Sequence, residues 1–177
     1  HDYVYDAAIK GAKAAIVKKL CRKANFPQLI VKDTSTSLAR LGEYWRANFT
    51  MPVVVITGSV GKTTVKEMIG SILNQTGSCV ISEGNMNNEI GLPLTLFKIG
   101  GKTKFVVLEM GAAKVGDIEY LAKLAKPDIG VITCCAPAHL KNFKSLENIA
   151  LTKGALVSNL SLQGTAILNR EDYFFER

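Results

Sequence analysis

The chain has 177 residues, enough for one well-buried domain or for one domain plus part of a neighbour. Hydrophobic residues make up 47% of it and charged residues 21%, which indicates a globular chain without long disordered tracts. Its longest apolar stretches, such as 51–56, are far shorter than the roughly 20 residues of a membrane-spanning helix. The net charge of +7 comes from scattered basic residues, a pattern that fits small anionic ligands at least as well as nucleic acid, and we expect no nucleic-acid partner.

The first part of the chain, before Pro52, lacks the regular alternation of short apolar runs and longer amphipathic stretches that the rest of the chain shows. We expect a short helix at 6–11, apolar runs at 14–17 and 29–31, and then a longer helix opened by 34–37. The hydroxyls of this last segment can cap the helix, because they accept hydrogen bonds from the free amides of its first turn. A bare short helix is an unusual start for an independent domain. We therefore predict that 1–48 is the end of a smaller α/β N-terminal domain.

From Pro52 onward, short apolar runs alternate with longer amphipathic stretches, which is the pattern of βαβ units and a mostly parallel sheet. The expected strands are 53–57, 79–82, 105–109, 129–133 and 165–169. The expected helices are 62–75, 90–97, 117–125 and 145–159. We predict an α/β fold over 49–177, with helices on both faces of the sheet and ligand loops at the carboxyl ends of the strands.

A glycine-rich loop, Gly58-Ser59-Val60-Gly61-Lys62-Thr63, follows the first of these strands and leads into a helix. Its glycines let the backbone curl so that successive amides point at an anion, and the helix N-terminus adds a favourable dipole. Lys62 offers a cation to the outer phosphates of a nucleotide, and Thr63 offers a hydroxyl to Mg²⁺. The general phosphate-loop pattern has glycine at position 56, where this chain has Ile56. The loop therefore belongs to a variant that begins with Thr57-Gly58.

Further polar residues follow other predicted strands. Glu109 ends the third strand, where a carboxylate can reach a metal on the phosphates, since hard Mg²⁺ prefers oxygen ligands. Asn87 and Asn88 follow the second strand and are either turn residues or hydrogen-bonding partners for a nucleotide or an acyl group. Taken alone, His139 fits a structural histidine and Lys153 fits a solvated helix lysine.

Four cysteines, Cys21, Cys79, Cys134 and Cys135, form no CxxC pair, and two of them are adjacent. This spacing is poorly suited to a disulfide or a zinc site, so we expect reduced thiols in the core. The first residues do not resemble a secretory signal, because they are polar and acidic. We therefore expect a cytoplasmic protein.

The segment Thr57–Thr64 resembles the ATP loop of the Mur ligases, and the likeness continues through 65–68. The asparagine-rich segment 84–93 is similar to the corresponding segment of one branch of that family, the branch that joins D-alanyl-D-alanine to UDP-N-acetylmuramoyl-tripeptide. Further matching segments are 107–111, 138–140 and 168–169, so the resemblance covers essentially the whole chain. It implies that 1–48 ends a domain that binds the UDP-sugar and that 49–177 is an incomplete central ATP-binding domain.

The resemblance also implies roles for single residues. It places Glu109 on one Mg²⁺, and His139 and Lys153 at a second, with Lys153 carbamylated by CO₂ into an oxygen ligand. The implied catalytic set is Lys62, Glu109, His139 and Lys153, and the metal ligands are Thr63, Glu109, His139 and Lys153. The implied nucleotide contacts are Thr57, Gly58, Ser59, Val60, Gly61, Lys62, Thr63, Thr64, Asn88 and Asn169. Asn87 and Asn88 are implied to contact the substrate. The chain departs from this branch at Thr133-Cys134, where asparagines are common.

The implied reaction is ATP-driven amide formation in peptidoglycan synthesis. A carboxylate of UDP-N-acetylmuramoyl-tripeptide attacks the γ-phosphate of ATP, and the amine of D-alanyl-D-alanine displaces phosphate from the resulting acyl phosphate. The amine-binding domain is expected to lie outside this chain, which we therefore predict to be a fragment that binds ATP weakly and does not ligate. We expect a monomer.

Two other readings remain open from the residues. The first is a related ligase of the folylpolyglutamate or cyanophycin type, which shares the phosphate loop, although the Asn87-Asn88 segment argues against it. The second is a phosphate-loop switch protein that binds a partner. A switch would need no metal-binding histidine and lysine, so replacing His139 separates the ligase readings from the switch.

Overall fold

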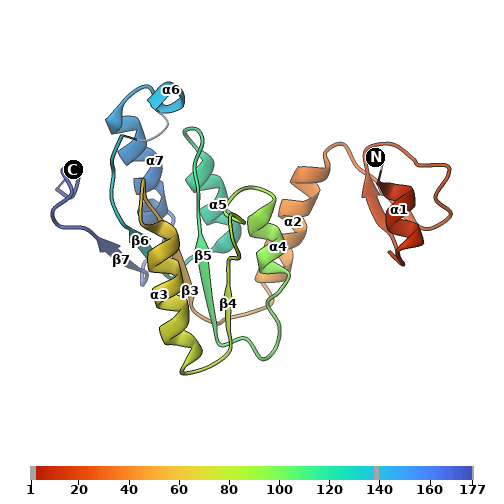
Figure 1. The fold of residues 1–177 in the computed structure, drawn as a ribbon, viewed down its shortest axis with the longest axis horizontal. Helices are drawn as coiled ribbons and strands as arrows, with labels where there is room; N and C mark the ends of the chain where they lie inside the picture. The colour runs from red at the N-terminus through yellow and green to blue at the C-terminus, as the bar shows by residue number, and fades with distance from the viewer. Residues whose placement is uncertain (1–2, 138–139, 177) are drawn as a thin grey trace.

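The computed structural model describes residues 3–137 and 140–176 (Figure 1). Its N-terminal part contains α1 (Val4–Ile9), β1 (Ala15–Val17), β2 (Gln28–Ile30) and α2 (Thr34–Arg46). The larger part alternates strands and helices: β3 (Val53–Thr57), α3 (Lys62–Asn74), β4 (Cys79–Ile81), α4 (Gly91–Leu96), β5 (Phe105–Glu109), α5 (Asp117–Ala125), β6 (Ile129–Ile132), α6 (Leu140–Phe143), α7 (Leu146–Ser158) and β7 (Thr165–Leu168). None of the helices in these described ranges is long and apolar enough to cross a membrane.

Strands β3 to β7 form one parallel sheet in the order β4-β5-β3-β6-β7. The strand that precedes the glycine-rich loop, β3, lies at the centre, between β5 and β6. Because all five strands run in the same direction, their carboxyl ends meet at one edge. The loops after β3, β4, β5 and β6 therefore converge there, as expected at a change of strand order in such a sheet.

Helices cover both faces of the sheet, as its near-continuous apolar strands require. Val54 and Ile56 of β3 face α3 and pack with its partly buried residues Val65, Ile69 and Leu73. The alternate residues of the same strand face the opposite core, which α2, α4, α5 and α7 complete. In Figure 1, α3 lies on one side of the sheet, and α5 and α7 lie on the other.

The predicted α/β class is confirmed, and the element bounds agree closely with the expected ones. Strands β3 and β5 have the predicted limits, and β4, β6 and β7 each end one residue earlier. The short helix α6 was not predicted. The expected cap of α2 was wrong: the N-cap is Asp33, whose carboxylate accepts from the Thr36 amide at 2.8 Å. The Ser37 hydroxyl instead donates to the Asp33 carbonyl.

The N-terminal segment forms its own small parallel sheet from β1 and β2, set apart from the main sheet (Figure 1). Helix α2 links the two parts, because it packs against α4 and α5. Buried Arg46 at its last turn donates to the carbonyls of Phe49, Ala125 and Lys126. The predicted boundary near residue 48 stays a prediction.

Candidate active site

The glycine-rich loop between β3 and α3 has a backbone that other residues do not adopt readily. Gly58 has a φ of 148° and Gly61 a φ of 80°, both in the region that favours glycine. A Cβ added at Gly58 would lie 1.8 Å from the Thr133 hydroxyl oxygen. Gly61 is the N-cap of α3, so the free amides of that helix open onto the loop. This arrangement is suited to an anion.

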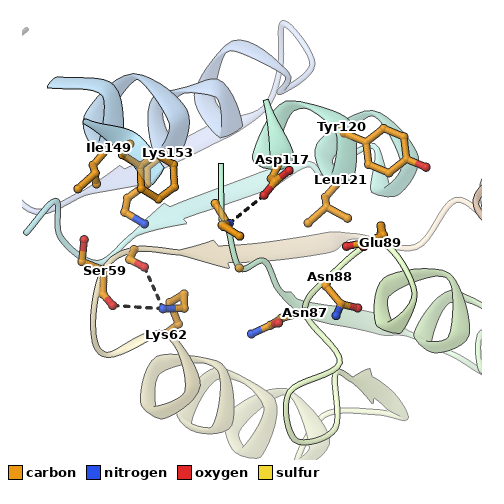
Figure 2. A pocket seen from close by; sticks show the side chains of 15 residues that line it. Ser59, Lys62, Asn87, Asn88, Glu89, Asp117, Tyr120, Leu121, Ile149 and Lys153 are labelled. Atoms are coloured by element: carbon orange, nitrogen blue, oxygen red, sulfur yellow. Dashed lines mark hydrogen bonds between the residues drawn. The ribbon is translucent and has the colours of Figure 1, made fainter. Parts of the chain in front are cut away.

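Lys62 is folded back over this loop. Its ammonium donates to the carbonyl oxygens of Gly58 at 2.9 Å and Ser59 at 3.3 Å, as the dashed lines in Figure 2 show. These bonds hold the cation at the mouth of the loop, where it lines a cavity of about 470 Å³. A phosphate that enters the cavity can take over the ammonium as a charge-assisted partner.

The glycine-rich loop is bonded to the segment that follows β6. The Ser59 hydroxyl donates to the Ala136 carbonyl at 2.8 Å and accepts from the Ala136 amide at 2.9 Å. The Ser59 amide donates to the Cys134 carbonyl, and the Thr133 hydroxyl donates to the Val60 carbonyl at 2.6 Å. These bonds hold the two loops against each other. Thr133 and Cys134 take part in them, which the sequence pattern did not indicate.

Glu109, at the end of β5, is 3% exposed and its carboxylate is bonded on both oxygens. The Thr63 hydroxyl donates to Oε2 at 2.8 Å, and the Asn87 amide donates to Oε1 at 2.9 Å. Both donors are neutral, and no salt bridge to Glu109 is found within the described ranges. A negative carboxylate beside a hydroxyl, both at the phosphate loop, is the oxygen donor set that Mg²⁺ prefers.

The two adjacent asparagines divide their roles. Asn87 holds Glu109 through its side chain and accepts from the Gly111 amide through its backbone carbonyl. The Asn88 side-chain oxygen accepts from the amides of Ile90 and Gly91 at the start of α4. Both residues line the cavity, opposite Lys153 (Figure 2). The predicted turn role is confirmed for Asn88, and the predicted contacts of both asparagines with nucleotide or substrate stay predictions.

Lys153 comes from α7, and its ammonium points toward Lys62 across the cavity (Figure 2). The side chain is nearly buried, so the expectation of a solvated helix lysine does not hold for it. Burial lowers the pKa of Lys153 to about 8, and the positive charge of Lys62 acts in the same direction. A substantial fraction of this lysine is therefore neutral and nucleophilic at slightly alkaline pH.

Other predicted residues lie apart from the cavity or outside the described ranges. His139 is outside them. Thr57 is buried, and its hydroxyl donates to the Met110 carbonyl. Thr64 and Val60 are exposed. Asn169 lines a second cavity of about 860 Å³ beside α7 and β7, and accepts from the Glu171 amide.

Asp117 and Tyr120, on α5, line the first cavity although the sequence did not single them out. Asp117 accepts from the amides of Ala113 and Lys114 and so shapes the loop after β5. The sequence could have indicated Asp117, because it starts the predicted helix that follows the carboxyl end of a predicted strand. Within the described part of the chain no group of three or more His, Cys, Asp and Glu side chains forms a metal cluster.

A parallel sheet whose central strand feeds a phosphate loop, with an acidic residue on the neighbouring strand end, defines a phosphate-loop α/β protein. The Mur ligase middle domain family matches residues 56–177. The chain belongs to the Mur ligase family.

Named relatives agree with this assignment. The chain is 41% identical over 175 residues to the UDP-N-acetylmuramoyl-tripeptide--D-alanyl-D-alanine ligase of Haemophilus influenzae, covering 97% of this chain and 38% of that protein. It is 38% identical over 172 residues to the ligase of the same name from Escherichia coli, covering 97% of this chain and 38% of that protein. The chain thus spans about two fifths of these relatives.

Solved structures give the same result. The fold matches MurF from Acinetobacter baumannii with a TM-score of 0.93 and 35% identity, over 98% of this chain and 38% of that one. It matches MurF ligase from Thermotoga maritima in complex with ADP with a TM-score of 0.85 and 33% identity, over 97% of this chain and 40% of that one. These matches confirm the predicted Mur ligase resemblance and do not favour the folylpolyglutamate, cyanophycin or switch readings.

Proposed function

We propose that the chain is the nucleotide-binding part of an ATP-dependent ligase that joins D-alanyl-D-alanine to UDP-N-acetylmuramoyl-tripeptide in peptidoglycan synthesis. Relatives that carry this name extend well beyond the matched region. Residues 1–48 are proposed to end the UDP-sugar domain and 49–177 to form most of the central domain. The amine-binding domain belongs to the remaining length. We further propose a cytoplasmic monomer.

One observation carries this proposal: Lys62, Asn88 and Lys153 reach a single cavity from three different elements, beside the Thr63–Glu109 pair. The reaction brings a substrate carboxylate to the γ-phosphate of ATP, which concentrates negative charge. Lys62 and the amides at the start of α3 would hold the phosphates, and Asn88 would orient the incoming carboxylate. Such a site works by positioning and charge stabilisation. Asn169 is proposed to contact the nucleotide from the second cavity.

The oxygens of Thr63 and Glu109 fit one Mg²⁺, because both are hard donors at the phosphate loop and the carboxylate has only neutral partners there. A bound Mg²⁺ would offset the phosphate charge during transfer. Lys153 as a free amine does not fit a second Mg²⁺, but as a carbamate it would. Its lowered pKa supports carbamylation, since only the neutral amine adds CO₂. His139 is proposed as a further ligand from the family resemblance.

The test is product formation by the full-length ligase, with ATP and UDP-N-acetylmuramoyl-tripeptide, in the presence and absence of D-alanyl-D-alanine. We expect phosphate release and a new ligated product only when the dipeptide is present. Phosphate release without either substrate, and without product, would leave a nucleotide site but remove the ligase function. The 177-residue chain alone is expected to bind ATP weakly, and ligation by it would refute the proposed division into domains.

A further inference from the structure

Lys66 is a buried cation that the proposed reaction does not use. It lies on α3, one turn beyond Lys62, and its side chain is 0% exposed. Its ammonium donates to the Ser82 carbonyl at 2.7 Å and pairs with the Glu67 carboxylate at 2.9 Å. A buried ammonium costs several kcal/mol in lost hydration, and an apolar side chain of the same size would avoid that cost. Packing alone therefore does not explain why a charged residue occupies position 66.

Close packing of α3 on β4 sets where this ammonium lies. A Cβ added at Gly70 would stand 2.3 Å from Ile81 Cδ1, so glycine lets the helix approach the strand. Lys66 is one helical turn before Gly70 on the same face. Its side chain consequently extends over the residue that follows β4, which is Ser82.

Ser82 connects the ammonium to β5. It is 1% exposed, and its amide donates to the Val107 carbonyl at 3.0 Å. Its hydroxyl accepts from the backbone amide of Glu109 at 3.1 Å. One serine therefore accepts from Lys66 on its carbonyl and from Glu109 on its hydroxyl.

The Glu109 carboxylate is held from two sides. Thr63 and Asn87 bind its oxygens directly, and both are neutral donors, so its negative charge stays available to a cation. Ser82 fixes its backbone, and Lys66 fixes Ser82. The Lys66 ammonium therefore acts on Glu109 through Ser82. It orders the backbone of Glu109 without forming a salt bridge to the carboxylate, and such a salt bridge would compete with a metal ion.

We propose that Lys66 is a positioning residue for the Mg²⁺-binding carboxylate Glu109 and acts through Ser82; this rests on the proposed function of the site. Groups that orient metal ligands without touching the metal commonly change its affinity by about 10- to 100-fold when they are removed. Lys66 should therefore affect Mg²⁺-dependent nucleotide binding more than binding of the nucleotide itself.

The experiment measures the affinity of the full-length ligase for a non-hydrolysable ATP analogue, in saturating Mg²⁺ and in excess EDTA. Lys66→Met keeps the length of the side chain and removes its charge. We expect the affinity in Mg²⁺ to fall about tenfold and the affinity in EDTA to stay within about twofold of the wild type. Lys66→Arg, which keeps a donor, should recover part of the loss. Equal losses under both conditions, or no loss under either, would overturn the proposal.

Two further variants keep the test decisive. Glu67→Gln removes the counter-charge of Lys66 and leaves its bond to Ser82, so it should lower stability without a Mg²⁺-specific loss of affinity. Ser82→Ala removes the acceptor of the Glu109 amide and keeps the carbonyl that Lys66 binds, so it tests the second link alone. It should show the same Mg²⁺-specific loss, and an unchanged affinity in Mg²⁺ would overturn the route through Ser82 even if Lys66→Met does not fold. Binding of the analogue by the wild type separately tests the proposed function, because a wild type that binds none in either condition refutes the nucleotide site itself.

Discussion

The hydroxyl of Thr63 donates to the carboxylate of Glu109 at 2.8 Å, although the two residues are 46 positions apart in the chain. Thr63 lies in the first turn of α3 and Glu109 ends β5, and the sheet brings them together because β5 pairs directly with β3. The strand order thus places an oxygen pair at the phosphate loop.

Breaking this pair should separate nucleotide binding from ligation. Glu109→Gln keeps the shape of the side chain and removes its charge, so we expect ligation by the full-length ligase to fall about 10²- to 10³-fold. Nucleotide affinity in EDTA should change little, since Lys62 and the loop amides remain. Steady-state product formation and binding titrations measure the two effects. Glu43→Gln is a matched control on α2, where the carboxylate pairs only weakly with Lys126, and it should leave both unchanged.

A side chain at Gly58 should disable the phosphate loop. The added Cβ of Gly58→Ala would meet the Thr133 hydroxyl oxygen at 1.8 Å, and the φ of 148° is itself unfavourable for alanine. Moving Thr133 aside would break its bond to the Val60 carbonyl. We expect a loss of roughly 1–3 kcal/mol in stability from overpacking, together with loss of nucleotide binding.

Gly101→Ala is the control for this substitution, because a Cβ there meets nothing within 4 Å. Thermal denaturation and nucleotide titration of both variants give the comparison. If Gly58→Ala binds nucleotide as well as Gly101→Ala does, the close approach of the two loops has no functional importance.

Much of this fold could be predicted because the local signals are strong. The Val- and Ile-rich runs predicted β3 and β5 to the residue, and the residue pattern from Gly58 to Thr63 predicted the glycine-rich turn that leads from β3 into α3. What could not be predicted depends on tertiary contacts. The cap at Asp33, the burial of Lys153 and the bonds of Ser59 to Ala136 arise between segments whose distance in space no local pattern encodes.

Arg46 should contribute to stability and not to nucleotide binding. Its guanidinium donates to Ala125 at 3.0 Å and Phe49 at 2.7 Å, at the end of the sheet opposite the phosphate loop. Hydrogen bonds from a charged donor contribute roughly 1.5–3 kcal/mol, so Arg46→Met should lower the free energy of unfolding by about that amount. Urea denaturation measures it, with exposed Arg40→Met as the control. A reduced nucleotide affinity in the folded Arg46 variant would contradict the assignment.

Lys153 should make stability depend on pH in a defined window. Its pKa is lowered to about 8 in the folded chain from an ordinary value of 10.5, so between these values the unfolded chain binds more protons. The free energy of unfolding should therefore rise as pH increases from about 8 to 10.5, by about 3 kcal/mol relative to Lys153→Met. Below about pH 8 the cost of burying the ammonium is fully present, and Lys153→Met should be the more stable variant.

Carbon dioxide gives this prediction a second readout. If the neutral amine adds CO₂, the product is an anion beside Lys62, so bicarbonate should stabilise the wild type near pH 8 and leave Lys153→Met unaffected. Nuclear magnetic resonance with ¹³C-bicarbonate would detect the carbamate directly, and Lys102→Met, an exposed loop variant, should keep that signal. A stability curve with the same pH slope in the wild type and in Lys153→Met would show that Lys153 keeps its ordinary pKa, and the case for carbamylation at this position would then lose its physical basis.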